Sequence, residues 1–163
     1  MADRIRRRRG GTLTALDAML LHSPAFADGW YRLFGTVRDR CTLPPDLREA
    51  VILRIAVLND ASYAWAVHES PAREAGLSAG DLEVIRSGAV LPGTIGAALR
   101  YTDAMTREVT VPDTVFAEIR DVFDDRQILE LTVTIAGYNM VSRLLVALQV
   151  RAGDEVPPAI ALD

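Results

Sequence analysis

The sequence contains no lysine, one cysteine and two histidines, and these shortages exclude several kinds of chemistry. All eighteen basic residues of the 163 are arginines, so no lysine amine is available to form a Schiff base with a carbonyl substrate or with pyridoxal phosphate. The single cysteine, Cys41, excludes an intrachain disulfide and a dithiol redox cycle within one subunit. Two histidines without an HxH or HExxH pattern give little support to a dedicated metal site. We therefore expect neither a bound metal nor a cofactor.

Several motifs and long apolar runs are also missing. The chain has no GxGxxG after a strand, no P-loop and no GxSxG elbow, so nucleotide cofactors and serine hydrolysis have no support. No apolar run reaches the roughly 20 residues that span a bilayer, and no secretory signal is recognisable. Together with the low cysteine content, these absences predict a cytoplasmic protein without a membrane partner.

The composition predicts one globular domain behind a short tail. Half of the residues are hydrophobic and the net charge is -4, which suits a single domain with a sizeable core over residues 12–163. Residues 1–11 include the basic run RIRRRR. Because blocks of like charge are usually disordered and the remainder is acidic, we expect a solvated tail and no nucleic-acid partner.

The hydrophobic pattern follows the helical period, and no segment alternates as a strand does. We therefore expect an all-α protein of six to eight helices without a sheet. Two helices, 44–58 and 124–151, are apolar on more faces than one small subunit needs, which predicts a homo-oligomer. The expected helices cover residues 14–21, 24–40, 44–58, 61–76, 79–87, 94–107, 112–123 and 124–151.

Glu49 and His68 are isolated titratable residues in these apolar helices. If the helices pack antiparallel, Glu49 lies about ten residues, or roughly 15 Å, before the turn, and His68 about eight residues, or roughly 12 Å, after it. The two side chains are therefore expected to meet and to exchange protons as a general acid and base. Two structural alternatives stay open. In the first, Glu49 is only a carboxylate at the start of a helix, where it interacts favourably with the helix dipole. In the second, His68 is a core histidine that donates a hydrogen bond to a backbone carbonyl.

The spacing around this pair resembles a family signature. Glu49, eleven residues, Ala61, two residues, Ala64, three residues and His68 resemble the pattern of the carboxymuconolactone decarboxylase and alkylhydroperoxidase D-like superfamily. In its peroxidase branch the two alanine positions are the cysteines of a Cys-x-x-Cys pair. The resemblance continues through LPPDLREAVILRIAVLN and DRQILELTVTIAGYNMVSRLLVALQV. It implies the alkylhydroperoxidase D-like helical fold, assembly as a trimer or hexamer, and use of Glu49 and His68.

The resemblance implies a decarboxylase-like lyase or isomerase. We expect a cofactor-independent acid/base enzyme that acts on a small anionic lactone or keto acid, with Glu49 and His68 as catalytic residues. An alkylhydroperoxidase or peroxiredoxin-type antioxidant activity would need the paired cysteines. A third alternative is a binding or assembly protein that kept the fold without catalysis. An arginine would hold the substrate carboxylate, and the candidates for substrate contacts are Tyr63, Trp65, Arg54, Tyr138, Asn139 and Arg143.

Overall fold

The computed structural model describes residues 5–6, 11 and 13–153, and within them the chain is all-α. Eight helices have defined bounds there and no strand is present, as predicted. The predicted helix ends are correct to within two residues, except at the end of the last helix. The helices are α2 (Ala15–Leu21), α3 (Pro24–Asp39), α4 (Pro45–Leu58), α5 (Ser62–Glu74), α6 (Ala79–Ser87), α7 (Gly93–Arg107), α8 (Asp113–Val122) and α9 (Asp125–Ala147).

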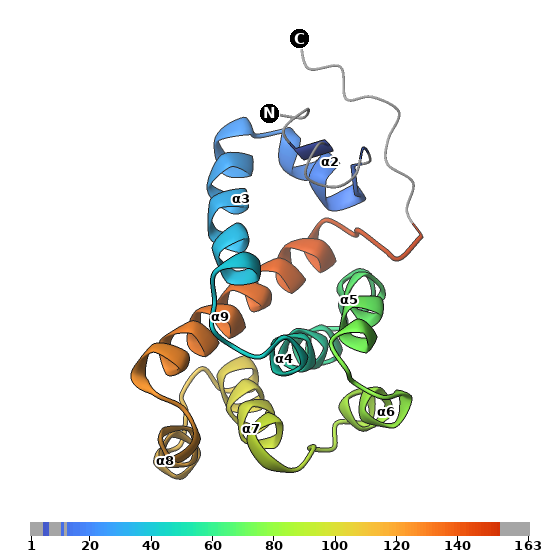
Figure 1. Cartoon of the computed structure of the whole chain (residues 1–163). Helices are drawn as coiled ribbons and strands as arrows, with labels where there is room; N and C mark the ends of the chain where they lie inside the picture. The colour runs from blue at the N-terminus through green and yellow to red at the C-terminus, as the bar shows by residue number, and fades with distance from the viewer. Residues whose placement is uncertain (1–4, 7–10, 12, 154–163) are drawn as a thin grey trace. The chain divides into compact units, whose positions relative to one another are not determined.

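These helices fall into two compact units (Figure 1). One contains α2 and α3 and extends to Arg40, and the other, residues 41–152, contains α4 to α9. In the first unit a capping box between Thr14 and Asp17 starts α2, and the Tyr31 hydroxyl of α3 donates to the buried Asp17 carboxylate. The single domain over residues 12–163 stays a prediction. Most of the expected tail, residues 1–11, lies outside the described residues.

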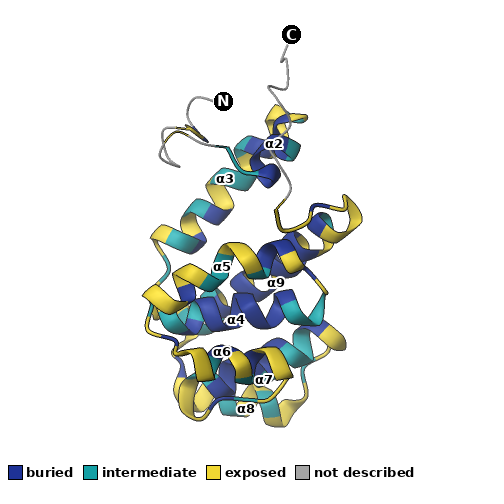
Figure 2. Ribbon diagram, turned by 90° about the vertical axis from the view of Figure 1, so that its right-hand side faces the viewer, coloured by how far each residue is buried: buried dark blue, intermediate teal, exposed yellow. Residues whose placement is uncertain are grey.

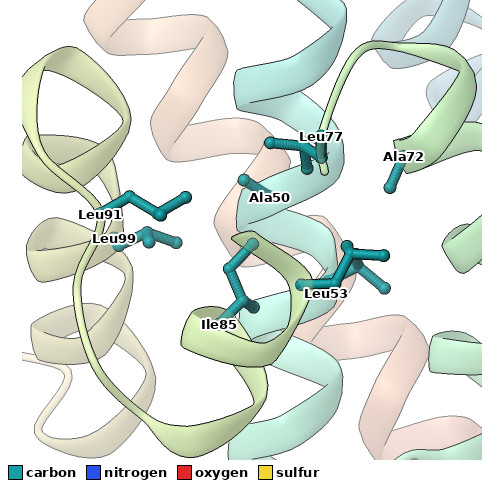
Figure 3. Close-up of a cluster of buried hydrophobic side chains, with 8 residues drawn as sticks. Ala50, Leu53, Ala72, Leu77, Ile85, Leu91 and Leu99 are labelled. Atoms are coloured by element: carbon teal, nitrogen blue, oxygen red, sulfur yellow. The ribbon is translucent and has the colours of Figure 1, made fainter. Parts of the chain in front are cut away.

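Helix α4 is the centre of the second unit and packs against α5, α6, α7 and α9. Every residue from Leu47 to Ala56 except Arg48 is buried, so most of the helix is dark blue in Figure 2. The apolar surface of α4, which predicted contacts between subunits, is thus covered by helices of its own unit. On the side of α6 and α7 it joins a cluster drawn in Figure 3, which consists of Ala50, Leu53, Ala72, Leu77, Leu82, Ile85, Leu91 and Leu99.

A three-residue turn sends the chain from α4 directly into α5. Asp60 adopts a left-handed conformation with φ of 53°, and its N–H donates to the Val57 carbonyl at 3.2 Å. The Ala61 N–H donates to the Ala56 carbonyl at 2.8 Å. These two bonds form a Schellman motif, which satisfies the last carbonyls of α4 and reverses the chain tightly. As a result α5 runs back along α4, which brings His68 toward Glu49.

Helix α9 ends at Ala147, four residues before the predicted end at Arg151. Gln149 takes a left-handed φ of 56°, a conformation that usually belongs to glycine. The Val150 N–H then donates to the Leu145 carbonyl at 2.9 Å, and the Val150 side chain is buried. The predicted end at Arg151 is wrong because the chain leaves the helical conformation at Gln149 and thereby buries the Val150 side chain. None of the described helices is both long and apolar enough to cross a bilayer.

Candidate active site

Glu49 of α4 and His68 of α5 are in direct contact. His68 Nδ1 lies 2.7 Å from Glu49 Oε2, and the side chains are 15% and 8% exposed. With Nδ1–H donating to the carboxylate, Nε2 is left without a hydrogen bond within the described residues. The predicted contact is confirmed. The alternative of a core histidine bonded to a backbone carbonyl does not hold among these residues.

Two further residues adjoin this pair. Arg48, which the sequence analysis did not select, has its Nε 3.6 Å from Glu49 Oε1 and a side chain that is 14% exposed. Tyr138 of α9 places its ring edge-on to the His68 imidazole, with centroids 5.3 Å apart and planes at 85°. The pair therefore lies between a permanent positive charge and an aromatic ring. The sequence did carry a signal for Arg48, because it directly precedes Glu49 near the start of a helix whose later residues are almost all apolar.

Ala61 and Ala64 lie beside the start of α5 and are both buried. Ala61 is the N-cap residue, and Ala64 lies one turn before His68 on the same face of the helix. These are the positions where the peroxidase pattern has cysteines. Neither of these two positions near His68 therefore carries a thiol.

Arg54 does not face this pair, although it was a predicted substrate contact. Its side chain is 1% exposed and its Nε and Nη2 donate to the two oxygens of Asp103 at 2.6 and 2.5 Å. The remaining N–H groups donate to the carbonyls of Ile85, Gly88 and Ala89. Since all five donors are used inside the protein, no donor remains for a substrate carboxylate. Arg54 instead ties α4 to α7 and to the end of α6.

Asn139, another predicted substrate contact, links three helices. Its Oδ1 accepts from Asn59 at the end of α4 at 3.1 Å, and its Nδ2 donates to Thr106 of α7 at 2.9 Å and to the Ile135 carbonyl at 3.1 Å. The residue is 5% exposed. A buried amide with these partners serves packing, because a ligand would have to displace bonds that are already made.

The other three substrate candidates form no hydrogen bond, ion pair or ring contact with Glu49 or His68 among the described residues. Tyr63 is nearly buried in the first turn of α5. Trp65 donates from Nε1 to Glu69 at 2.8 Å, and the Arg86 guanidinium lies 4.1 Å from its ring centroid. Arg143 is exposed on α9. Of the six candidates, Tyr138 is thus the one with a ring contact to the pair among the described residues.

Cys41 is half-buried just before α4. Burial and the nearby Glu130 carboxylate raise the pKa of its thiol, and these effects outweigh the opposing influence of Arg48 and Arg126. A raised pKa means that little thiolate exists at neutral pH. Within the part of the chain that the structure describes, no group of three His, Cys, Asp or Glu residues could hold a metal ion.

The spacing from Glu49 to His68 lies within a segment that matches a known family. Residues 24–104 match the sequence model of the carboxymuconolactone decarboxylase family. The chain belongs to this family. As a carboxymuconolactone decarboxylase family member it contains Glu49 and His68 but has alanines at the two cysteine positions of the peroxidase pattern. No sequence among the curated proteins matches the chain.

Two solved structures share the fold of this carboxymuconolactone decarboxylase family member. One is an Agrobacterium tumefaciens protein of unknown function, described as a candidate antioxidant defence protein AhpD, with 24% identity, a TM-score of 0.77 and coverage of 84% of this chain and 97% of that chain. The other is an uncharacterized peroxidase-related protein from Silicibacter sp. TM1040, with 17% identity, a TM-score of 0.76 and coverage of 89% and 78%. At these identities the likeness shows the AhpD-like all-α fold.

Proposed function

We propose that this protein is a cofactor-independent acid/base enzyme, a decarboxylase or isomerase that acts on a small anionic lactone or keto acid. The observation that carries the proposal is the 2.7 Å contact between His68 Nδ1 and Glu49 Oε2. Both side chains are mostly shielded from water but His68 is not fully enclosed. A carboxylate on Nδ1 orients an imidazole and stabilises its charged form, so that Nε2 can accept and return a proton.

The same pair can support either reaction. In an isomerisation, neutral His68 takes a proton from a carbon next to a carbonyl at Nε2 and returns it to a different carbon of the conjugated anion. In a decarboxylation, the bond to the carboxylate breaks, carbon dioxide leaves, and the electron pair enters the conjugated system of the substrate. Protonated His68 then delivers its Nε2 proton to the resulting enolate or dienolate.

A screen in deuterated water tests the proposal. Small lactones and keto acids, each with a carboxylate, are incubated with the protein and followed by ¹H NMR for loss of carbon dioxide or movement of a double bond. We expect deuterium at one carbon of the product, because the returned proton comes from the enzyme in exchange with solvent. A substrate that is converted equally well by Glu49→Gln and His68→Asn variants would contradict the assignment of the pair.

We expect no thiol-dependent peroxidase activity. Ala61 and Ala64 cannot form a thiolate or a disulfide, and the raised pKa of Cys41 leaves that thiol poorly reactive. Turnover of an organic hydroperoxide with a dithiol donor should stay at the rate without protein. The measurement is peroxide consumption, with Cys41→Ser as the control. Robust turnover of the hydroperoxide that persists in Cys41→Ser would contradict this expectation.

We also propose that the protein is a cytoplasmic homo-oligomer, a trimer or hexamer, that uses the exposed face of α9. Leu129, Val133 and Met140 are exposed on that face at a spacing of four and seven residues, and large apolar patches are uncommon on monomers. Met140→Glu should therefore lower the mass measured by light scattering at micromolar concentration. The matched control is Val109→Glu, at an exposed loop position outside α9. A wild-type protein that is a stable monomer would contradict the prediction.

A further inference from the structure

We propose that Tyr138 is a positioning residue for His68, whose ring fixes the plane of the imidazole and thereby the direction of Nε2. This role rests on the proposed function, because it explains how the same site presents the nitrogen that transfers the proton. It replaces the role of substrate contact that the sequence predicted for Tyr138. The Tyr138 side chain is 3% exposed and so has little surface to offer a ligand.

The hydrogen bond to Glu49 does not orient the His68 ring by itself. Within the described residues the imidazole has this one hydrogen bond, from Nδ1 to Oε2 at 2.7 Å. The bond fixes one atom of the ring, and the terminal torsion of a histidine side chain has a broad minimum. The ring can therefore tilt about Nδ1 without breaking the bond, and such a tilt moves Nε2. A second contact is needed to fix the plane.

The Tyr138 ring supplies this second contact. The centroids of the tyrosine and imidazole rings are 5.3 Å apart, and their planes make an angle of 85°. Aromatic rings prefer such an edge-to-face arrangement, with centroids roughly 4.5–7 Å apart, because the positive edge of one ring meets the negative face of the other. The ring contact depends on the angle between the planes, whereas the hydrogen bond depends on the position of Nδ1. Together the two contacts fix both the position and the plane of the His68 ring.

Tyr138 lies on a helix that is tied to the helix of Glu49. Helix α9 packs against both α4 and α5 (Figure 2). Asn139, the next residue of α9, accepts a hydrogen bond at 3.1 Å from Asn59, at the end of α4. Consecutive residues of a helix point about 100° apart, so the two neighbours on α9 contact different helices. His68 on α5 is thus held by one residue of α4 and one residue of α9, and these two helices are bonded to each other.

NMR of the His68 ring tests this role without a substrate. Protein labelled with ¹⁵N and ¹³C at histidine gives two sets of ring signals, which His22→Asn assigns because the chain has two histidines. In the wild type we expect Overhauser contacts between the rings of Tyr138 and His68. We also expect an ordered imidazole and, in its neutral form, one tautomer with the proton on Nδ1. A wild-type ring that is mobile or mixes tautomers would overturn the proposal.

Variants separate the ring of Tyr138 from its hydroxyl group. Tyr138→Phe keeps the ring, so the order and tautomer of His68 should match the wild type. Tyr138→Leu removes the ring, so the imidazole should become mobile and populate the second tautomer. Order and tautomer are compared rather than chemical shift, because loss of the ring current shifts the signal in any case. Tyr138→Met, whose flexible side chain fills irregular gaps, gives the same comparison if the leucine variant does not fold.

The matched control is another buried tyrosine of the second unit. Tyr101 of α7 is 4% exposed, and its ring lies 6.3 Å from that of Phe116, between centroids. Tyr101→Leu removes a ring of the same size from the core but should leave the order and tautomer of His68 unchanged. A general loosening of the core would instead affect His68 equally in Tyr101→Leu and Tyr138→Leu, which would contradict a specific role of Tyr138.

Kinetics give a second measurement once the screen has supplied a substrate. Tyr138→Leu should lower kcat roughly tenfold or more, because a small displacement of a reacting group lowers the rate steeply. KM should stay within about twofold of wild type, since a residue that acts through His68 does not bind the substrate. Tyr138→Phe should keep the kcat of the wild type.

The results distinguish this role from the proposed function. An ordered, single-tautomer His68 in Tyr138→Leu, or equal disorder in Tyr138→Phe and Tyr138→Leu, would overturn the role of the ring. Turnover that depends on Glu49 and His68 but is unchanged in Tyr138→Leu would also overturn it and leave the proposed function standing. Order of His68 that depends on the Tyr138 ring, in a protein without turnover, would support the positioning role and contradict only the proposed function.

Discussion

Replacement of Glu49 by Gln or of His68 by Asn is expected to abolish turnover while leaving the protein folded. Loss of a general acid or base typically lowers the rate by about 10²- to 10⁴-fold. Glu49→Gln retains the shape of the side chain and an oxygen that accepts from His68 Nδ1, so the loss of stability should be near that of one hydrogen bond, about 1 kcal/mol. The measurement is kcat on a substrate found in the screen, together with the melting temperature.

The double variant distinguishes a catalytic unit from two independent residues. If His68 transfers the proton and Glu49 acts through it, the double variant Glu49→Gln/His68→Asn should be as active as the less active of the two single variants. Glu74→Gln, an exposed carboxylate on the same helix as His68, is the matched control and should stay within about twofold of wild type. A melting temperature lowered by many degrees, with normal activity in the folded fraction, would show that the pair is structural.

Replacement of Arg54 by Met is expected to lower the stability of the protein more than the substitutions at Glu49, His68 or Arg100. The change removes five hydrogen bonds at once and leaves the Asp103 carboxylate, which is 20% exposed, without its arginine. The carbonyls of Ile85, Gly88 and Ala89 lose their donors as well. Removal of one partner of a buried ion pair typically costs about 3–5 kcal/mol. For a chain of this size we expect the melting temperature to fall by roughly 6–20 °C.

A surface ion pair provides the control for Arg54. Arg100 pairs with Glu118 between α7 and α8, but these side chains are 42% and 35% exposed. Because solvent screens such a pair, Arg100→Gln should cost about 1 kcal/mol or less. Both variants are measured at one protein concentration, since assembly would raise the apparent stability. An Arg54→Met protein that melts within 2 °C of wild type, in the range of about 1 kcal/mol, would contradict a structural role for the pair.

Local sequence signals predicted most of the fold. The predicted starts of α2, α3, α4, α6 and α9 are correct to one residue. In the structure these starts have local features, which are capping boxes before α2, α6 and α9 and prolines at the starts of α3 and α4. The contact between Glu49 and His68 was also predictable, because it follows from the spacing of two residues about a tight turn. In both cases the information lies within one helix or one hairpin. The end of α9 was not predictable in this way, because Gln149 takes a conformation that its residue type does not favour.

The roles of the polar residues depended on contacts between distant segments. As letters, Arg48, Arg54 and Arg143 are equivalent cations near apolar sequence. Arg54 is structural because Asp103 and the end of α6 fold against it, whereas the Nε of Arg48 lies 3.6 Å from Oε1 of Glu49.

The sequence by itself therefore determined the helices, the family and the central Glu49–His68 pair. Periodicity, caps and short-range spacing act within a few turns of chain, which is why they can be read without a structure. Only the tertiary structure decided which arginine lies at the pair and that Asn139 links helices rather than facing a ligand. The reason is physical: a guanidinium or an amide is available to a ligand only if its donors are not already used by residues far away in the sequence.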